Sequence, residues 1–200
     1  MKNIAVLILA AGKSSRMHSI KQLEKINNKT LLDITLDKVN MLFFENIFCV
    51  LGANYDEIKQ GIISKNIAFI NNKKFENGLS SSIVSGINYF NENKLNFDGI
   101  FILLADQPVI EITYLKSMLA LFKENNDSII ASNYGSKLGV PAIFPKKYFT
   151  DLLQIKGDKG AKEFINKRKK EVICPKSTTN FFDIDTKTDL ELFKKSILKS

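Results

Sequence analysis

Short apolar runs alternate with segments of helical periodicity along almost the whole chain, and this alternation restricts the folds that the chain can adopt. The first run, residues 4–9, contains only apolar residues, as expected of a strand that is covered on both faces. The same pattern predicts strands at residues 47–51, 67–70, 100–104, 128–132, 139–144, 172–174 and 180–184, and helices at residues 30–43, 54–63, 80–90, 112–123, 158–168 and 188–198. Because strands that alternate with helices pair in parallel through right-handed crossovers, we expect an α/β fold with a mainly parallel sheet. There is no repeat or linker, so residues 1–200 are expected to form one domain.

The chain carries 29 lysines and arginines against 21 aspartates and glutamates, which gives a net charge of +8. Such an excess is typical of a nucleic-acid surface, of a site for small anions, or of a lysine-rich composition alone. No apolar run approaches the ~20 residues that a transmembrane helix needs, and the apolar start leads into Gly12-Lys13 instead of a cleavage site. The two cysteines, Cys49 and Cys174, lie far apart in apolar contexts. We therefore expect a cytoplasmic protein with reduced thiols and no membrane partner.

In a sheet of this kind, ligands bind beyond the carboxyl ends of the strands, so the loops after the strands are informative. Residues 9–17 read LAAGKSSRM, and Lys21 follows. Small residues let the backbone approach a ligand, consecutive N–H groups can form an anion-binding nest, and Arg16 and Lys21 add positive charge for a triphosphate. The alternative is a tight turn that carries two surface charges. The loop is not a Walker A motif, which would need glycine where Leu7 stands, and it contains no G-x-G-x-x-G.

A run of serines stands before the helix expected at residues 80–90. Residues 77–82 read NGLSSS. Serines in this position cap a helix, and a helix N-terminus also favours an anionic or polar ligand. Plain N-capping and ligand binding both account for this segment.

Asp106 follows the apolar strand expected at residues 100–104, in the sequence LADQP. A carboxylate at the end of a buried strand is costly unless it has a partner, and Mg²⁺ that bridges to phosphates is a natural partner. The alternative is a turn residue that caps the next segment.

Two further aspartates, Asp183 and Asp185, lie near the end of the chain. Alternation along a strand would place both on one face, where one of them could complete a metal site. Thr186 with Asp189 could equally form only the N-terminal cap of the last helix. His18 is the only histidine, so neither a zinc site nor a Ser-His-Asp arrangement is expected.

Taken in order, six segments resemble the MobA-like nucleotidyltransferases, and most closely their molybdenum cofactor cytidylyltransferase branch. They are LAAGKSSRMHSIK from residue 9, GLSSSI from residue 78, LADQP from residue 104, GVP from residue 139, GDKGAK from residue 157 and DIDTKTDL from residue 183. The resemblance implies a Rossmann-like three-layer sandwich that binds CTP with Mg²⁺. It also implies transfer of CMP to the terminal phosphate of molybdopterin that carries molybdenum, with release of pyrophosphate. A recipient molybdoenzyme or its chaperone would be a partner.

The same resemblance implies a role for each site residue. The nucleotide would be held by residues of the first loop and of the serine segment, namely Leu9, Ala10, Ala11, Gly12, Ser14, Ser15, Gly78, Ser80 and Ser81. Of these, Gly78, Ser80 and Ser81 would lie near the base and the ribose. Arg16 and Lys21 would face the phosphates and act in catalysis together with Asp106. Asp106 would carry the metal with Asp183 as its second ligand, and residues 139–141 would help to shape the acceptor pocket.

Other functions are compatible with the same residues. Related enzymes use GTP on the same cofactor or activate a sugar or alditol phosphate. A nucleic-acid-binding module would follow from the +8 charge. However, Asp106 and Asp183 in the site would repel a polynucleotide, so no nucleic-acid partner is expected. A chaperone that only holds the cofactor is disfavoured by the presence of Arg16, Lys21 and Asp106.

Overall fold

The computed structural model describes residues 3–42, 45–177 and 179–197. Seven strands form one sheet, and they are β1 (Ile4–Ala10), β4 (Ile47–Leu51), β5 (Ala68–Asn71), β6 (Gly99–Leu104), β7 (Ile129–Asn133), β8 (Leu138–Pro145) and β9 (Val172–Ile173). A separate hairpin contains β2 (Lys25–Ile26) and β3 (Lys29–Thr30). The helices are α1 (Leu31–Asn40), α2 (Tyr55–Gly61), α3 (Leu79–Glu92), α4 (Ile112–Glu124), α5 (Phe149–Leu152), α6 (Gly160–Lys167) and α7 (Lys187–Ile197). Short 3₁₀ turns, η1 (Lys21–Leu23), η2 (Phe75–Asn77), η3 (Lys146–Tyr148) and η4 (Lys169–Glu171), connect them.

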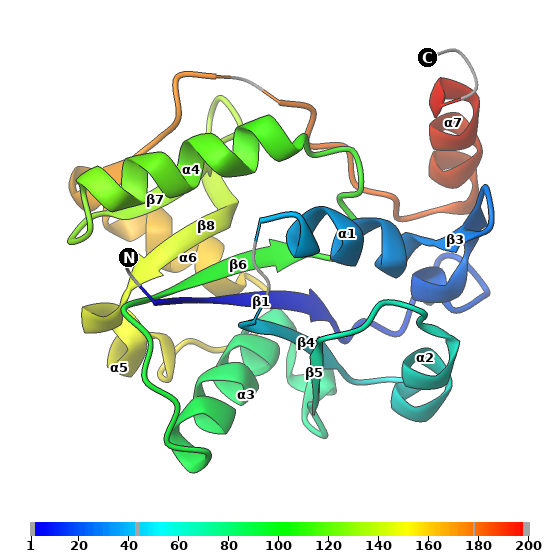
Figure 1. Cartoon of the computed structure of the whole chain (residues 1–200), viewed down its shortest axis with the longest axis horizontal. Helices are drawn as coiled ribbons and strands as arrows, with labels where there is room; N and C mark the ends of the chain where they lie inside the picture. The colour runs from blue at the N-terminus through cyan, green and yellow to red at the C-terminus, as the bar shows by residue number, and fades with distance from the viewer. Residues whose placement is uncertain (1–2, 43–44, 178, 198–200) are drawn as a thin grey trace.

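The strands lie in the order β5-β4-β1-β6-β8-β7-β9 (Figure 1). The strands β5, β4, β1 and β6 are parallel, whereas β8 runs antiparallel to both β6 and β7. The predicted α/β fold with a mainly parallel sheet is therefore confirmed. β8 is the exception because only residues 134–137 separate it from β7, and so short a connection can join only antiparallel strands.

Helices cover both faces of the sheet and make it the middle of three layers. Helices α1 and α4 pack on one face, and α3, α5 and α6 pack on the other (Figure 1). All seven residues of β1 are buried, and they alternate between the two faces: Val6 and Ile8 contact the first layer, while Ala5 and Leu7 contact the second. A strand covered on both faces has no polar side, which explains why its sequence is continuously apolar.

A third apolar cluster joins the two ends of the chain. Met17 and Ile26, near the N-terminal hairpin, pack with Ile184, Leu190 and Phe193 near and within α7. This cluster lies beyond the carboxyl end of β1, and it brings residues 183–190 next to the loop that follows β1 (Figure 1). Contacts between segments so distant in sequence leave no local pattern from which they could be predicted.

The strand predicted at residues 180–184 is wrong. Residues 180–186 are irregular, and Ile184 donates one backbone hydrogen bond, of 2.9 Å, to the carbonyl oxygen of Asp106. Ile184 is buried in the third cluster and Phe182 packs against it, whereas Phe181 packs against the first cluster, so these side chains are covered without a strand partner. Asp183 and Asp185 are consequently not related by strand alternation. The predicted ends of two helices, residues 43 and 198, lie outside the described residues.

No helix within the described ranges is both long enough and apolar enough to span a lipid bilayer.

Candidate active site

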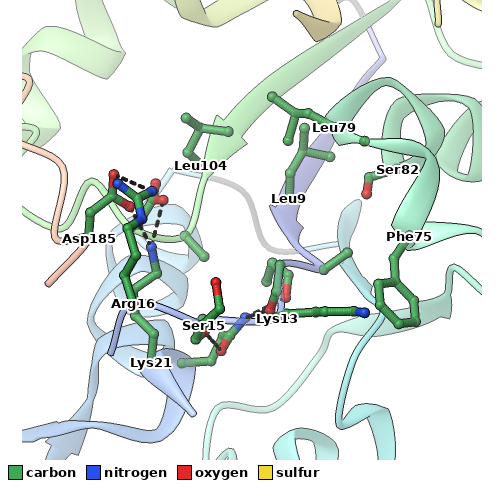
Figure 2. A pocket seen from close by; sticks show the side chains of 18 of the residues that line it. Leu9, Lys13, Ser15, Arg16, Lys21, Phe75, Leu79, Ser82, Leu104 and Asp185 are labelled. Atoms are coloured by element: carbon green, nitrogen blue, oxygen red, sulfur yellow. Dashed lines mark hydrogen bonds and ion pairs between the residues drawn. The ribbon is translucent and has the colours of Figure 1, made fainter. Parts of the chain in front are cut away.

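A cavity of about 590 Å³ lies at the carboxyl ends of β1 and β6 (Figure 2). The structure brings most of the predicted site residues to its wall: Leu9, Ala10, Ala11, Gly12, Ser14, Ser15, Arg16, Lys21, Gly78 and Asp106. Three predicted site residues, Ser80, Ser81 and Asp183, do not line it. The wall also includes Lys13, Leu79, Ser82 and Asp158, which have no role predicted from the sequence, and Asp185, the alternative to Asp183 as a metal ligand.

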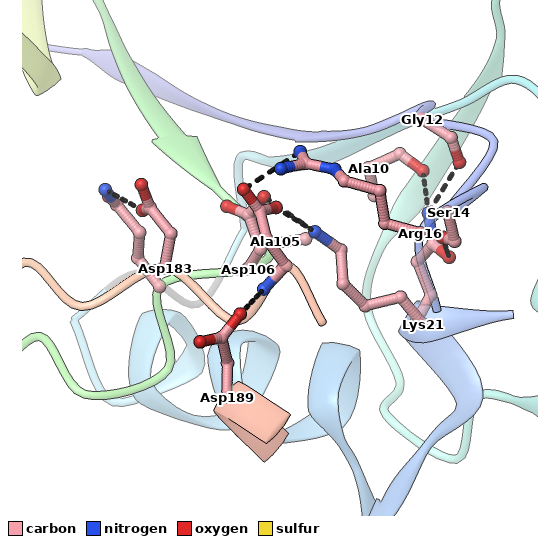
Figure 3. Close-up of polar contacts among 12 residues, drawn as sticks. Ala10, Gly12, Ser14, Arg16, Lys21, Ala105, Asp106, Asp183 and Asp189 are labelled. Atoms are coloured by element: carbon pink, nitrogen blue, oxygen red, sulfur yellow. Dashed lines mark hydrogen bonds and ion pairs between the residues drawn. The ribbon is translucent and has the colours of Figure 1, made fainter. Parts of the chain in front are cut away.

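One end of the cavity carries an alternating cluster of two cations and two carboxylates (Figures 2 and 3). The Lys21 ammonium lies 2.9 Å from Oδ2 of Asp106 and 3.1 Å from Oδ1 of Asp185. The Arg16 guanidinium lies 3.0 Å from Oδ2 of Asp185. The Lys21 side chain is only 15% exposed, so it is the inner cation, whereas the Arg16 side chain is 68% exposed at the mouth. Screening by water is weaker around Lys21, so its two ion pairs are the stronger ones.

Asp106 supplies the deepest acceptor in this cluster. Its Oδ1 is buried, and no group in the described part of the chain donates a hydrogen bond to it. The backbone around it is held on both sides. The N–H of Ala105 donates to the carbonyl oxygen of Leu9 in β1 at 3.1 Å, and the carbonyl oxygen of Asp106 accepts from the N–H of Ile184 at 2.9 Å. An ionised oxygen without a partner is costly away from water, so this atom fits a bound cation.

The loop after β1 is held in shape by Gln22, which is itself buried. Its Nε2 donates to the carbonyl oxygens of Ala10, at 2.8 Å, and Gly12, at 3.2 Å, and its Oε1 accepts from Ser14 Oγ (Figure 3). Within the described ranges, none of the backbone N–H groups of residues 12–16 donates to another protein group. These free donors lie in a loop that lines the cavity beside two cations, which is an arrangement that suits an anion.

The other end of the cavity is lined by Phe75, Leu79 and Ser82, next to Gly78 (Figure 2). Ser82 Oγ accepts a hydrogen bond of 3.1 Å from Nδ2 of Asn72, so its own proton remains free for a ligand. Ser82 belongs to the GLSSSI segment, but the resemblance gave a role near the base and the ribose only to Gly78, Ser80 and Ser81.

Ser80 and Ser81, which are expected from the resemblance to lie near a bound base and ribose, do not line this cavity. Both line a neighbouring cavity on the other side of the first turn of α3. Ser80 is buried, and Ser81 Oγ donates to the carbonyl oxygen of Gly78 at 2.8 Å. Consecutive helical residues point about 100° apart, so three serines in a row cannot all face one cavity.

Gly78 is the point at which α3 contacts the segment before α6. Its φ of +87° favours glycine, and a Cβ there would overlap the Asp158 carboxylate and lie 2.6 Å from the carbonyl carbon of Gly157. The backbone N–H of Ser80 donates to the carbonyl oxygen of Gly157 at 3.1 Å. This close packing brings Asp158 of the GDKGAK segment to the cavity wall, whereas the sequence alone indicated only a structural turn.

Asp183, which the resemblance makes the second metal ligand, is hydrogen bonded to Gln107. Its Oδ1 accepts a 2.7 Å hydrogen bond from Nε2 of Gln107, which also donates to Tyr134 Oη at 3.0 Å. Asp183 is exposed as a residue, but protein atoms around its carboxyl group remove part of its hydration. This desolvation, followed by the nearby carboxylates of Asp106 and Asp185, raises its pKa, and the Gln107 hydrogen bond only partly opposes the rise. Among these C-terminal aspartates, it is Asp185 that faces Lys21 in the cavity.

The described residues contain no group of three or more histidine, cysteine, aspartate or glutamate side chains that could enclose a metal ion by themselves. The cavity instead offers two carboxylates, Asp106 and Asp185, at one end. Mg²⁺ is typically held in this way, by one or two carboxylates together with substrate phosphates. The donor set therefore fits a metal that arrives with a phosphorylated substrate better than a permanently enclosed ion.

A family model described as the MobA-like NTP transferase domain matches residues 6–172. The chain belongs to this family. This family is named for transferase activity on nucleoside triphosphates (NTPs). The match ends at residue 172, so Asp185, the second carboxylate of the charged cluster, lies C-terminal to the matched region.

A curated protein and solved structures are also similar to this chain. The bifunctional protein GlmU of Francisella philomiragia is 31% identical over 119 residues, which are 58% of this chain and 25% of that protein. The chain thus matches about a quarter of the length of this curated relative. A solved homologue of Mycobacterium tuberculosis Rv0371c, from Mycobacterium sp. strain JC1, is 26% identical with a TM-score of 0.82, over 98% of this chain and 97% of that one. Rv0371c in complex with manganese is 21% identical with a TM-score of 0.72, over 97% and 99%, and shows a shared fold.

Proposed function

We propose that this MobA-like transferase moves CMP from Mg-CTP to the terminal phosphate of a molybdopterin-type acceptor and releases pyrophosphate. The observation that carries the proposal is the charged cluster of Arg16, Lys21, Asp106 and Asp185 beside free backbone N–H groups. This combination suits a triphosphate that brings its own divalent cation. The choice of CTP and of the acceptor rests on the six segments that resemble the molybdenum cofactor cytidylyltransferases. The product would pass to a recipient molybdoenzyme or to its chaperone.

The cations of the cluster would bind the phosphates. Without nucleotide, Lys21 and Arg16 are paired with Asp106 and Asp185. A triphosphate carries more negative charge than a carboxylate that is already paired with two cations. Both cations would therefore pair with the nucleotide when it binds. The N–H groups of residues 12–16 would donate to the same phosphates.

Asp106 and Asp185 would then hold the divalent cation. Oδ1 of Asp106 supports this assignment, since it is buried without a hydrogen-bond donor in the described structure. When bound, Mg²⁺ neutralises phosphate charge and fixes the orientation of the triphosphate. The related fold of Rv0371c has been solved in complex with manganese, which is consistent with a divalent ion in this family of folds.

The reaction itself demands little covalent chemistry from the protein. The terminal phosphate of the acceptor is ionised at neutral pH, so its oxygen attacks the α-phosphorus of CTP without a general base. The bond to the pyrophosphate group breaks as the new phosphate bond forms. Arg16 and Lys21 would align the two anions and offset their repulsion, and such positioning and electrostatic stabilisation account for most of the rate. A catalytic histidine or cysteine is not required.

A thermal-shift panel of CTP, GTP, ATP and UTP, each with Mg²⁺, tests the nucleotide. At about 100 times its dissociation constant, the true substrate should stabilise the protein by about 2.7 kcal/mol, because it binds the folded state alone. We expect CTP to give the largest shift, and omission of Mg²⁺ to reduce it. Pyrophosphate release with a molybdopterin acceptor, compared with sugar and alditol phosphates, then tests the acceptor. If no nucleotide raises the melting temperature, the proposed function is wrong.

Asp185→Asn and Asp183→Asn distinguish the two candidates for the second metal ligand. Asp185 faces Lys21 in the cavity, whereas Asp183 contacts Gln107 outside it. We expect Asp185→Asn to lower turnover at limiting Mg²⁺ by about a hundredfold, with partial recovery at high Mg²⁺. Asp183→Asn keeps the Gln107 contact through its amide oxygen and should change turnover by less than about threefold. The opposite ranking of the two variants in a Mg²⁺ titration would return the role to Asp183.

A further inference from the structure

A second cavity, of about 800 Å³, lies on the other side of the first turn of α3. Its wall comes from the end of β5 and the residues that follow, from α3, and from residues 153–157. No residue lines both this cavity and the candidate active site, and none of the charged cluster reaches it. The proposed nucleotidyl transfer therefore leaves this cavity without a role.

The second cavity is electropositive. Lys73, Lys74 and Lys156 line it, and Glu92 is the one acidic residue on its wall. In the part of the chain that the structure describes, none of these three lysines forms an ion pair. Three unpaired ammonium groups around one hollow favour an anionic occupant.

Ser80 supplies a buried donor on the same wall. It is 1% exposed, and its hydroxyl has no hydrogen-bond partner in the described structure. A buried hydroxyl without a partner costs free energy, which a ligand acceptor would recover. Ser80 also lies in the first turn of α3, where the helix dipole favours negative charge. The backbone N–H groups of Ser80 and Ser81 are already used, by Gly157 and Gly78, so the hydroxyl is the donor that remains.

The wall also has an apolar part, formed by Tyr55, Phe69 and Tyr89. Aromatic surface of this kind suits an organic ligand with a ring better than a bare inorganic ion. We infer that the second cavity is a binding site for a small organic phosphate, with its phosphate near Ser80 and the lysines and its ring against the aromatic side chains.

The two cavities share one hydrogen-bonding residue. Nδ2 of Asn72 donates to Ser81 Oγ, at 2.8 Å, on the side of the second cavity and to Ser82 Oγ, at 3.1 Å, on the side of the nucleotide cavity. The side-chain amide of Asn72 therefore lies between the two cavities, where its NMR signal can respond to a bound ligand.

Phenyl phosphate, which carries a ring and a phosphate, is the probe for this site. In a ¹H–¹⁵N NMR titration of the full chain without divalent cations, we expect saturable shifts at Ser80, Ser81 and the Asn72 side chain. The double variant Lys73→Glu/Lys156→Glu should weaken this binding at least tenfold, since it reverses two charges on the wall. It should leave the CTP-dependent thermal shift unchanged, which separates this site from the proposed function.

The matched control is Lys116→Glu/Lys123→Glu, which reverses two exposed charges on α4, a helix of the opposite layer. It should leave the affinity for phenyl phosphate unchanged. An equal loss in this control would mean that the probe responds only to overall charge, and the inference would fail. Shifts confined to residues 10–16, or no saturable shifts, would also overturn it.

Discussion

Asp106→Ala is expected to reduce nucleotidyl transfer by about a thousandfold, measured as pyrophosphate release at saturating CTP and Mg²⁺. Asp106 presents a buried Oδ1 without a donor and an Oδ2 paired with Lys21, so its loss removes the deepest acceptor at the phosphate end of the cavity. Lys21 keeps Asp185 as a partner, at 3.1 Å. Because the Asp106 side chain is 25% exposed and one of its oxygens has no donor, the free energy of unfolding should fall by no more than about 1 kcal/mol.

Asp127→Ala is the control for this experiment. Asp127 is an exposed aspartate between α4 and β7, far from the cavity wall. It should retain the activity and melting temperature of the unmodified protein. Normal pyrophosphate release by Asp106→Ala, with the control also active, would falsify the assignment of the metal to Asp106.

Lys21→Met is expected to have the second largest effect. Lys21 is the inner cation, and it touches both carboxylates of the cluster. Its removal leaves Asp106 and Asp185 facing each other without a cation between them, and it removes a charge that would offset the repulsion between two anionic substrates. We expect the KM for CTP to rise and kcat to fall, with a combined loss of about a hundredfold or more in kcat/KM.

Lys29→Met tests whether that effect is specific. Lys29 pairs with Asp37 on the surface at 2.6 Å, outside the cavity, so its loss removes the same charge from the molecule without touching the site. CTP affinity should be unchanged in Lys29→Met. If both lysine variants bind CTP as the unmodified protein does, Lys21 has no role in nucleotide binding.

Much of the architecture could be predicted because it depends on local patterns. The continuous apolar run of β1 indicates burial on both faces. The apolar residues of α1, α3 and α4 recur at helical spacing, which indicates one buried face on each helix. The direction of β8 could not be read in this way, since it is set by a short turn and not by periodicity. The strand predicted at residues 180–184 failed for a related reason. An apolar segment shows that side chains are buried, but not whether a sheet or another cluster buries them.

The same distinction between local patterns and tertiary packing applies to the candidate site. The loop after β1 and Asp106 could be located from sequence because a strand end fixes where such residues emerge. Ser82 could not be separated from Ser80 and Ser81, because only the rotation of α3 against the sheet decides which serine faces the cavity. Lys13 also lines the cavity and pairs with Glu76, at 2.6 Å. The sequence indicated only two useful cations there.

By itself, the sequence determined the α/β fold and the family, and it indicated the residues that we propose to hold phosphate at the ends of β1 and β6, because each depends on neighbours along the chain. Only the tertiary structure decided that Asp185, and not Asp183, faces Lys21. That choice depends on the apolar packing of Ile184 and α7 against Met17, which sets the rotation of an irregular segment more than 160 residues away in sequence. The packing of this cluster follows no periodic pattern in the sequence, so the position of Asp185 beside Lys21 can be seen only in the folded chain.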